Sequence, residues 1–533
     1  MDLTRRDFVK STLAAGGALY AGGAAPEMAF GAERLKEPAS LAKARQEARK
    51  RRRRIIYNND GAEPMESGVN TPEEFLARRM QAVPGTQVDS VFYSPGSTTI
   101  FTHLAKVGET YGQNGTPAWN HAKVNIEALR KGGHDTLAMV TDFCHEHKVE
   151  IVFSHRINDI HDSFMPEDLS LWKRKHPDYC LGTKADLKYP ADSPKHWWSA
   201  LDFEKPQVRD YLFGILEDVC KRYDVDGIEV DYFRSPMFFH TTMNDKPTTP
   251  AQIKIMTGFH RRICEMAYRE GTRRGRPILV VPRVPMTVEL CKYVGIDVVA
   301  WLEEGLADLL TTGGGYIPWT MPTAELSDVG HKHGIQVYPS ISGSGMRQAG
   351  SIEGWRGAAS NAGAAGADGI YLFNHFPKEP SQQFKELGSA ETLAGRDKIF
   401  IIDRVYIGEG DLRPGIAQAH ILPKPIPADG KPLVLNLPIG DDLPAAAAEG
   451  KLASAEMSVQ IAEPAGAESV AVKLNGRALK PARTDAKAGS LTFQLDGKAC
   501  RKGPNELTLS APGRQAEAKP LRAMAVELHV KYT

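Results

Sequence analysis

Several features are scarce in this sequence, and each shortage narrows what the chain can be. Only six of its 533 residues are cysteines, and they show no CxxC or other metal-binding spacing, so buried free thiols are expected. An excess of one charge is also lacking, because 66 Lys and Arg face 65 Asp and Glu. This balance gives no reason to expect nucleic acid or a membrane surface as a partner. After the N-terminal region, no stretch approaches the length of a membrane-spanning helix.

The N-terminus carries an export pattern. The segment TRRDFVK (residues 4–10) precedes an Ala- and Gly-rich apolar run over residues 12–25, and small residues follow near Ala29 and Gly31. This resembles a twin-arginine signal, so we expect residues 1–32 to be an export signal peptide that is not part of the fold. The mature protein is then expected to be periplasmic or secreted. A chance Arg-Arg pair in a tail is the alternative. Residues 33–54 end in four arginines, and a charge run of this kind predicts a solvated basic linker.

Short strands alternate with helical patterns from Ile55 to Asn374, and eight strands are predicted. Eight is the number that closes a (β/α)8 TIM barrel, which we expect over residues 55–398 with two long insertions, 98–133 and 166–200. An open, doubly wound sheet is the alternative, but no GxGxxG opens a helix after the first strand. The predicted strands are residues 55–61 with their turn, 88–93, 149–154, 226–231, 278–283, 308–312, 335–340 and 369–373.

Beyond Lys398 the composition changes to short apolar runs separated by Gly, Pro and Asp turns. One example is residues 469–474, which are followed by the turn Asn475-Gly476. Regular short strands with turn signals predict a β-sandwich over residues 399–533. No catalytic constellation is visible there, so this domain either packs against the barrel, which we favour, or binds carbohydrate.

The rest of the chain is organised around residues 201–234. A helix with one apolar face leads into the strand at 226–231, where Glu229 and Asp231 point one way while Ile228 and Val230 point the other. In a barrel the apolar pair meets the helices and the carboxylates face the interior. Asp231 then lies at the C-terminal end of its strand, where such folds build active sites. The alternative is a buried structural acid paired with Arg234.

Residues just after each strand should converge on one cavity, and hydrogen-bonding and aromatic side chains prevail among them. Such a lining suits a polyhydroxylated ligand, so carbohydrate is the expected partner. The candidate catalytic residues are Asp231, Glu229, Asp159 and Asp60, with Asp162 as a loop alternative. The candidate substrate-binding residues are Asn59, Tyr93, His155, Arg156, Tyr232, Arg234, Arg283, Tyr338, Asn374 and His375.

Glycoside cleavage needs two carboxylates, and beyond Asp231 the second is not evident from the sequence. Three candidate residues are arginines, which match carboxylate and sulfate oxygens and so suggest an acidic glycan; alternatively each arginine pairs with a neighbouring acid and positions it. His155, Asp159, Asp231 and His375 could together form a metal site. They come from separate segments without a local HxH or HExxH spacing, so no metal or cofactor is predicted.

Two segments carry a resemblance to a known group: LDFEKPQVRDY (residues 201–211) and RYDVDGIEVDYFR (residues 222–234). They resemble bacterial glycosyl-hydrolase-like TIM-barrel proteins, which implies a barrel acting on glycans with Asp231 at the site. The second segment is distantly similar to the chitinase-type DGxDxDxE signature. Phe233 stands where that signature has its catalytic Glu, so that mechanism is not transferred. We therefore predict a glycoside hydrolase; the alternatives are a non-catalytic glycan-binding protein or a metal-dependent hydrolase.

Overall fold

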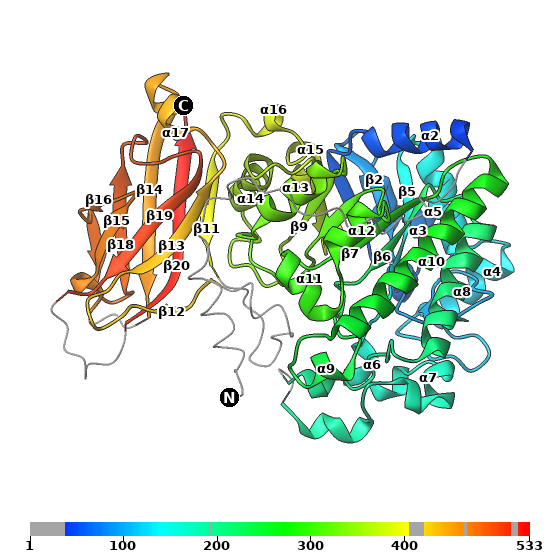
Figure 1. Cartoon of the computed structure of the whole chain (residues 1–533). Coiled ribbons are helices and arrows are strands. Elements are labelled where there is room, and N and C mark those ends of the chain that lie inside the picture. The colour runs from blue at the N-terminus through cyan, green and yellow to red at the C-terminus, as the bar shows by residue number, and fades with distance from the viewer. Residues whose placement is uncertain (1–37, 191–192, 404–420, 463–465, 513–520) are drawn as a thin grey trace, which may run out of the picture. The chain divides into compact units, whose positions relative to one another are not determined.

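Eight parallel strands close into a barrel in the order β1-β2-β5-β6-β7-β8-β9-β10, which confirms the predicted fold class (Figure 1). A computed structural model describes residues 38–190, 193–403, 421–462, 466–512 and 521–533. The strands are β1 (Ile55–Asn59), β2 (Val88–Tyr93), β5 (Glu150–Arg156), β6 (Gly227–Asp231), β7 (Leu279–Val284), β8 (Leu310–Thr312), β9 (Val337–Ser342) and β10 (Ile370–Phe373). The predicted export signal lies outside the described residues and stays a prediction. Within these ranges, no helix is both long and apolar enough to cross a membrane.

The outer helices form where the sequence places an apolar face between clear start and stop signals. In α8, Pro206 occupies the first turn and the apolar face from Val208 to Val219 is buried. In α10, Thr249 and Gln252 form a capping box, and Gly275 ends the helix in the left-handed conformation. The helices are α3 (Pro72–Arg79), α5 (Thr136–Glu146), α8 (Pro206–Arg222), α10 (Pro250–Arg274), α11 (Val288–Val294), α12 (Val298–Glu303), α13 (Thr323–Lys332), α14 (Ile352–Ala364), α15 (Gln382–Glu386) and α16 (Ala390–Leu393).

The two long insertions follow β2 and β5 and contact each other. The Glu109 carboxylate, in the first insertion, accepts hydrogen bonds from the backbone N–H groups of Leu171 (3.0 Å) and Trp172 (2.8 Å) in the second. This contact ties together the two loops that extend from neighbouring barrel strands. The insertions and the loop after β6 contain β3 (Ile100–Phe101), β4 (Glu109–Thr110), α4 (Ala122–Lys131), α6 (His161–Phe164), α7 (Leu171–Lys175) and α9 (His240–Met243).

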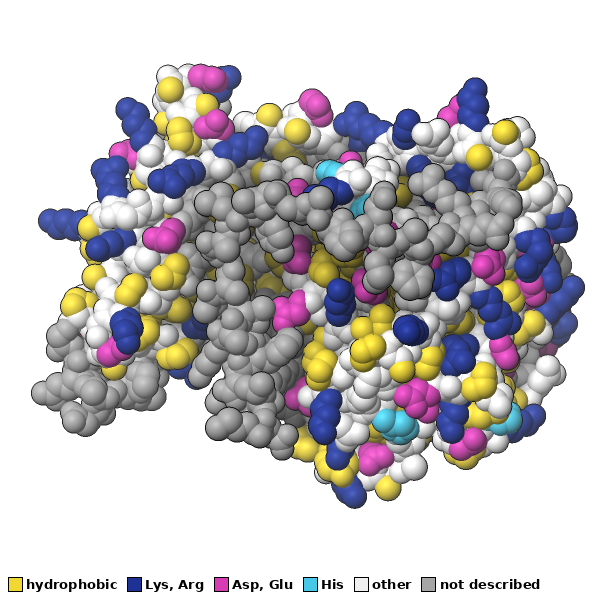
Figure 2. Space-filling view, in the orientation of Figure 1, with side chains coloured by type: hydrophobic (Ala, Val, Ile, Leu, Met, Phe, Trp, Pro, Cys, Tyr) yellow, Lys and Arg dark blue, Asp and Glu magenta, His cyan; other side chains and the backbone are white. Residues whose placement is uncertain are grey.

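The described part of the basic segment before β1, residues 38–54, is not the solvated linker that its charge predicted. Its helix, α2 (Ala39–Lys50), places Arg45 against Asp308 with a 2.8 Å ion pair that is almost fully buried. Arg53 is fully buried, and both of its bonds to Glu150 measure 2.6 Å. This segment is therefore bonded into the barrel. By contrast, acidic and basic side chains are interspersed on the surface shown in Figure 2.

The C-terminal region forms the predicted β-sandwich. Its larger sheet has the order β11-β20-β14-β18-β17, with β12 paired to β20, and its smaller sheet has the order β13-β19-β15-β16. The elements are β11 (Lys398–Ile402), β12 (Lys424–Pro425), β13 (Leu433–Ile439), α17 (Leu443–Ala448), β14 (Leu452–Ile461), β15 (Ala471–Leu474), β16 (Arg477–Leu479), β17 (Arg483–Asp485), β18 (Ser490–Leu495), β19 (Gly503–Ser510) and β20 (Arg522–Tyr532). A methyl group on Gly357 of α14 would lie 2.0 Å from the Ile399 carbonyl oxygen, so only glycine allows α14 to pack this closely on β11.

Candidate active site at the barrel rim

The strand register decides which side chains face the barrel interior. Arg156, Asp231 and Arg283 are aligned across β5, β6 and β7, so they share one face of the sheet. Glu229 shares that face too, because Tyr371 of β10 donates a 2.9 Å hydrogen bond to it across the barrel. The predicted inward orientation of Glu229 and Asp231 is therefore confirmed.

Asp231 is held on all sides by N–H donors. Arg283 donates a hydrogen bond to each carboxylate oxygen, from Nε to Oδ1 at 2.9 Å and from Nη2 to Oδ2. The backbone N–H groups of Phe233 (3.0 Å) and Arg234 (2.8 Å) also donate to Oδ1. Both charged side chains are only 1% exposed. Asp231 is thus a carboxylate fixed in position, and its ion-pair partner is Arg283 rather than the Arg234 of the structural alternative.

Glu229 lies deeper in the barrel and is surrounded by hydroxyl groups. Ser154 donates to Oε2 at 2.5 Å, Tyr371 to the same oxygen at 2.9 Å, and Thr311 to Oε1 at 2.9 Å. Burial raises the pKa of Glu229 to about 7; Arg283 opposes this shift and Asp231 adds to it. Near neutral pH this buried carboxyl group therefore holds a proton more readily than an exposed glutamate does.

Replacing Glu229 with Gln should change how stability depends on pH. Because the folded-state pKa of about 7 exceeds the ordinary value of 4.5, the wild-type group stabilises fully below pH 4.5 and loses this contribution as the pH rises through 7. The loss is on the order of 3 kcal/mol. Gln stays neutral, so E229Q should gain stability relative to wild type between pH 5 and pH 8 in urea unfolding. The exposed Glu146→Gln is the control, and equal pH slopes for E229Q and wild type would contradict the assignment.

A second charged cluster lies next to Asp231, in the loop after β5. Asp159 Oδ1 is 2.5 Å from Nδ1 of His161, and its Oδ2 is 3.3 Å from Nη1 of Arg156. Arg234 closes the cluster, since its Nη2 is 3.0 Å from Nε2 of His161 and its Nε is 3.8 Å from Asp159. Burial raises the pKa of Asp159, but His161, Arg156 and Arg234 together hold it well below its usual value. Arg234 therefore contacts Asp159 through its side chain and Asp231 through its backbone N–H.

Asp60 extends this cluster toward β1. Its carboxylate forms an ion pair with Arg79 of α3 and is 22% exposed. The Arg79 guanidinium in turn lies 4.1 Å from the centre of the Phe376 ring, in the loop after β10. Asp60 therefore remains at the rim as predicted, but it is already neutralised by an arginine.

Several predicted binding residues lie on the wrong face of the barrel wall. Asn59, Tyr93 and Phe153 align with the outward-facing Ile228, and His155 aligns with Val230. All are buried between strands and helices or loops. Side chains alternate between the two faces of a strand, and Asn59, Tyr93 and His155 point away from the cavity. The prediction took the last residues of each strand without regard to this alternation.

Three further positions also differ from the prediction. Tyr232 points outward, where its hydroxyl is 3.0 Å from Nδ1 of His260 in α10. Tyr338 faces the interior, but its hydroxyl bonds Gln336, on the N-terminal side of β9. His375 bonds the Ser381 hydroxyl at 3.0 Å and packs on Trp355. Each of these three side chains is therefore bonded to another residue of the scaffold.

Asn374 remains at the rim, where its side-chain amide donates to the Ser344 hydroxyl at 3.0 Å. The prediction did not include His161 or Trp119 in the site. The indole ring of Trp119, from the first insertion, lies 6.0 Å from the imidazole of His161. Their only signal was the presence of polar and aromatic residues in the loops after β2 and β5. Asp162, the loop alternative, turns away to pair with Lys173 at 2.7 Å.

The proposed metal ligands do not assemble. His155 lies on the outer face of β5 with Nε2 2.9 Å from the Thr98 carbonyl oxygen, and His375 bonds Ser381. Across the part of the chain that the structure describes, no group of three His, Cys, Asp or Glu side chains could hold a metal ion. The metal-dependent alternative therefore has no centre in the described residues.

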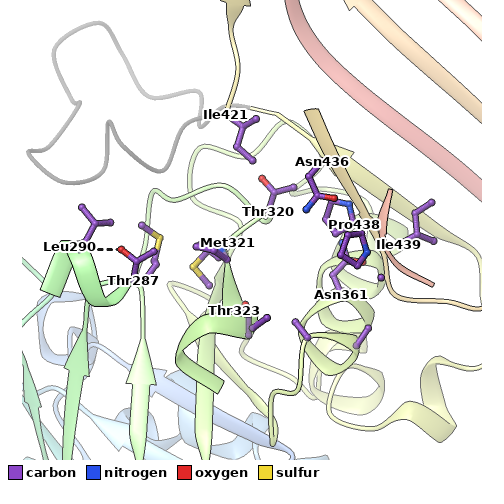
Figure 3. A pocket seen from close by; sticks show the side chains of 17 residues that line it. Thr287, Leu290, Thr320, Met321, Thr323, Asn361, Ile421, Asn436, Pro438 and Ile439 are labelled. Atoms are coloured by element: carbon purple, nitrogen blue, oxygen red, sulfur yellow. Dashed lines mark hydrogen bonds between the residues drawn. The ribbon is translucent and has the colours of Figure 1, made fainter. Parts of the chain in front are cut away.

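Two surface cavities lie away from this cluster. A cavity of about 430 Å³ lies among α11, α13, α14 and β13, with Met286, Met321 and Pro438 in its largely apolar wall (Figure 3). A second, of about 590 Å³, is formed by the insertion after β5 and includes Trp198. Asp231 lines neither of them. The site is therefore located by the charged residues at the strand ends and not by cavity size.

Comparisons with known proteins support the resemblance over the same segment. Residues 87–252 match the family described as Glycosyl hydrolase-like 10, and this range includes Asp159, His161 and Asp231. No curated protein gives a significant match. The resemblance to glycosyl-hydrolase-like proteins is thus confirmed for this part of the chain.

Three similar solved structures are glycosidases. Alpha-L-fucosidase isoenzyme 2 from Paenibacillus thiaminolyticus is 10% identical over 71% of this chain and 52% of that chain, with a TM-score of 0.38. The PgaB (BpsB) glycoside hydrolase domain from Bordetella bronchiseptica is 10% identical over 61% and 94%, with a TM-score of 0.35. A family 18 N-acetylglucosaminidase from Paenibacillus barengoltzii is 9% identical over 60% and 94%, with a TM-score of 0.32. The match spans about half the length of the fucosidase.

Proposed function

We propose that this chain is a glycoside hydrolase that cleaves a polysaccharide or oligosaccharide at the C-terminal rim of its barrel. One observation carries the proposal. Asp231 and the Asp159–His161 pair meet at Arg234, within the segment that matches the glycosyl hydrolase-like family. Such cleavage needs an anion beside the anomeric carbon and a proton for the leaving oxygen, and this cluster offers a group for each role.

Asp231 supplies the anion. Its four N–H contacts fix the carboxylate in one orientation, so it can act as nucleophile or base, or stabilise positive charge in the transition state, without reorganising. Asp159 is not suited to donate a proton, because its neighbours hold its pKa well below the usual value. Glu229 holds a proton more readily but is fully buried beneath Asp231.

His161 supplies the proton in this proposal. Its side chain is 35% exposed, and Asp159 holds the ring through Nδ1 at 2.5 Å. An imidazole anchored at Nδ1 can carry a proton at Nε2, where Arg234 now makes its contact. A bound sugar that takes over the Arg234 N–H leaves Nε2 free to take up a proton from water and to give it to the leaving oxygen.

The ion pairs of the rim arginines indicate that these residues position carboxylates rather than recognise an acidic substrate. Arg283 is paired with Asp231, and both Arg156 and Arg234 approach Asp159. Each arginine therefore holds a rim carboxylate in place, as the alternative to acidic-glycan recognition predicted. We propose a neutral glycan as the substrate and keep acidic glycans as an arm of the assay.

His161→Asn should separate substrates by their leaving groups. We expect hydrolysis of oligosaccharides to fall about 10²- to 10⁴-fold, because a sugar leaving group needs a proton. Aryl glycosides with an acidic phenol need no proton and should be cleaved at nearly the wild-type rate. Initial rates on neutral and acidic oligosaccharides and on aryl glycosides measure this, with the exposed His134→Asn as control. Equal losses on both substrate classes would remove His161 from the proton-transfer role.

A non-catalytic glycan-binding protein is the second candidate. It is favoured by one observation, that Asp60, Asp159 and Asp231 each lie in an ion pair with arginine. Wild-type protein that binds oligosaccharides in calorimetry but releases no product from any of them would select this candidate.

A further inference from the structure

One nitrogen of the Arg283 guanidinium has no hydrogen-bond partner among the described residues. Nε and Nη2 both bond Asp231, but Nη1 bonds none of the residues that the structure describes, although the side chain is only 1% exposed. Buried donors are almost always hydrogen-bonded, because burying an N–H group without an acceptor is unfavourable in free energy. The described part of the chain provides no acceptor for this donor beside the candidate nucleophile, so a bound ligand is the group that would pair with it.

The turn that follows β8 lies directly against this nitrogen. A methyl group on Gly314 would lie 3.3 Å from Nη1 of Arg283 and 3.2 Å from the Phe233 ring. One on Gly315 would lie 2.7 Å from the Phe373 ring. We name residues 313–316 the triglycine turn. Because three successive residues of the turn lack side chains, the turn places only backbone atoms beside Nη1.

The backbone of the triglycine turn is also strained. Tyr316 has a φ of 61° and Gly313 a φ of 74°, both in the left-handed region. That conformation is ordinary for glycine but unfavourable for tyrosine, and such strain persists mainly at functional sites. Asn374, which faces the turn from the end of β10, also has a positive φ of 53°. Two non-glycine residues with positive φ therefore lie in the triglycine turn or against it.

We propose that Arg283 Nη1 and the triglycine turn form a subsite for one hydroxyl oxygen of the sugar. The ligand group is neutral, because the two parallel bonds to Asp231 already balance the charge of the guanidinium and leave Nη1 as a plain N–H donor. The Phe373 ring, centred 4.6 Å from the guanidinium carbon, and the Phe233 ring beside Gly314 supply apolar surface for sugar C–H groups. This inference rests on the proposed function, since it assigns part of the same substrate.

The subsite makes Arg283 a specificity residue as well as the partner of Asp231. One rigid guanidinium holds the carboxylate through two nitrogens and the sugar hydroxyl through the third. The distance from the reacting carboxylate to that hydroxyl is then fixed by a planar group. Sugars that differ only in the configuration of this hydroxyl should be discriminated strongly, because the wrong epimer leaves Nη1 unpaired.

Gly314→Ala tests the subsite without removing a charged group. Its φ lies outside the left-handed region, so the backbone accepts alanine, but the new methyl group occupies the space beside Nη1. Gly350→Ala, in the loop after β9, is the matched control because a methyl group there meets nothing within 4 Å. We expect G314A to raise KM about tenfold or more with little change in melting temperature. G350A should match wild type in both.

A binding readout keeps this test separate from hydrolysis. Melting temperatures are measured with galactose, glucose, N-acetylglucosamine and glucuronate, and at least one neutral sugar should stabilise wild type and G350A but not G314A. That result without any hydrolysis would support the subsite while the glycosidase proposal fails. Equal KM or equal sugar stabilisation in G314A and G350A overturns the subsite alone. It is also overturned if only glucuronate binds, or if none of the four sugars stabilises wild type.

Discussion

Arg53→Met should lower the free energy of unfolding by about 3–5 kcal/mol, although Arg53 belongs to a run of four surface-like arginines. The reason is its partner. Arg53 is fully buried and holds both oxygens of Glu150, which is 3% exposed and also accepts a 2.6 Å bond from Ser90. Removing the guanidinium leaves an uncompensated carboxylate at the N-terminal end of the barrel. Urea unfolding at pH 7 measures the loss.

Two further variants test this explanation. Arg52→Met is the matched control, since Arg52 is 69% exposed and lies 4.0 Å from an exposed Glu391, so we expect less than about 0.5 kcal/mol. The double variant R53M/E150L replaces the buried pair with apolar groups and should recover most of the loss. If R53M and R52M are equally stable, the buried pair does not hold the barrel.

The arginine run shows what a sequence leaves undetermined. Charge and hydropathy are equal for Arg52 and Arg53, yet one is exposed and the other is buried. Glu150 is 97 residues from Arg53, and Asp308 is 263 residues from Arg45. These partners meet only when the barrel closes, so the pattern of neighbouring residues predicted a solvated linker.

The barrel itself was predictable because its signals are local. Apolar runs bounded by turn residues gave eight strands, and the apolar face of α8 and the caps of α10 follow from nearby residues. The sandwich followed in the same way, from short alternating runs such as β15 and its Asn-Gly turn. Elements whose stabilising contacts lie within a few residues can be predicted from sequence.

The rim was predicted without regard to parity except in β6. Alternation in β6 placed Glu229 and Asp231 inward, but elsewhere the final residues of each strand were taken together. In β1 the inward residue is Asn58, whose amide donates to the Phe92 carbonyl, while Asn59 faces outward. β5 continues to Arg156, two residues beyond its predicted end, which places His155 in the wall. Register across strands, which the sequence does not show, decides these positions.

Asp231→Ala should reduce hydrolysis at least about 10³-fold, because it removes the fixed anion beside the reacting carbon. The same change leaves Arg283 buried without a partner, so we also expect a loss of about 3–5 kcal/mol in stability. Activity and stability are therefore both expected to decrease. A loss of activity alone would not show whether Asp231 acts in the reaction or only holds Arg283. Rates per folded molecule, with folding followed by circular dichroism, are the first measurement.

Formate separates the two roles. It has the carboxylate geometry that the Arg283 fork binds, and the missing side chain leaves room for it. If Asp231 acts chemically, formate should raise both the melting temperature and the hydrolysis rate of D231A, while the exposed Asp178→Ala responds in neither. If formate restores stability but no activity, Asp231 only holds Arg283. The rim would then lack its proposed nucleophile or base, and the glycan-binding function would be favoured instead.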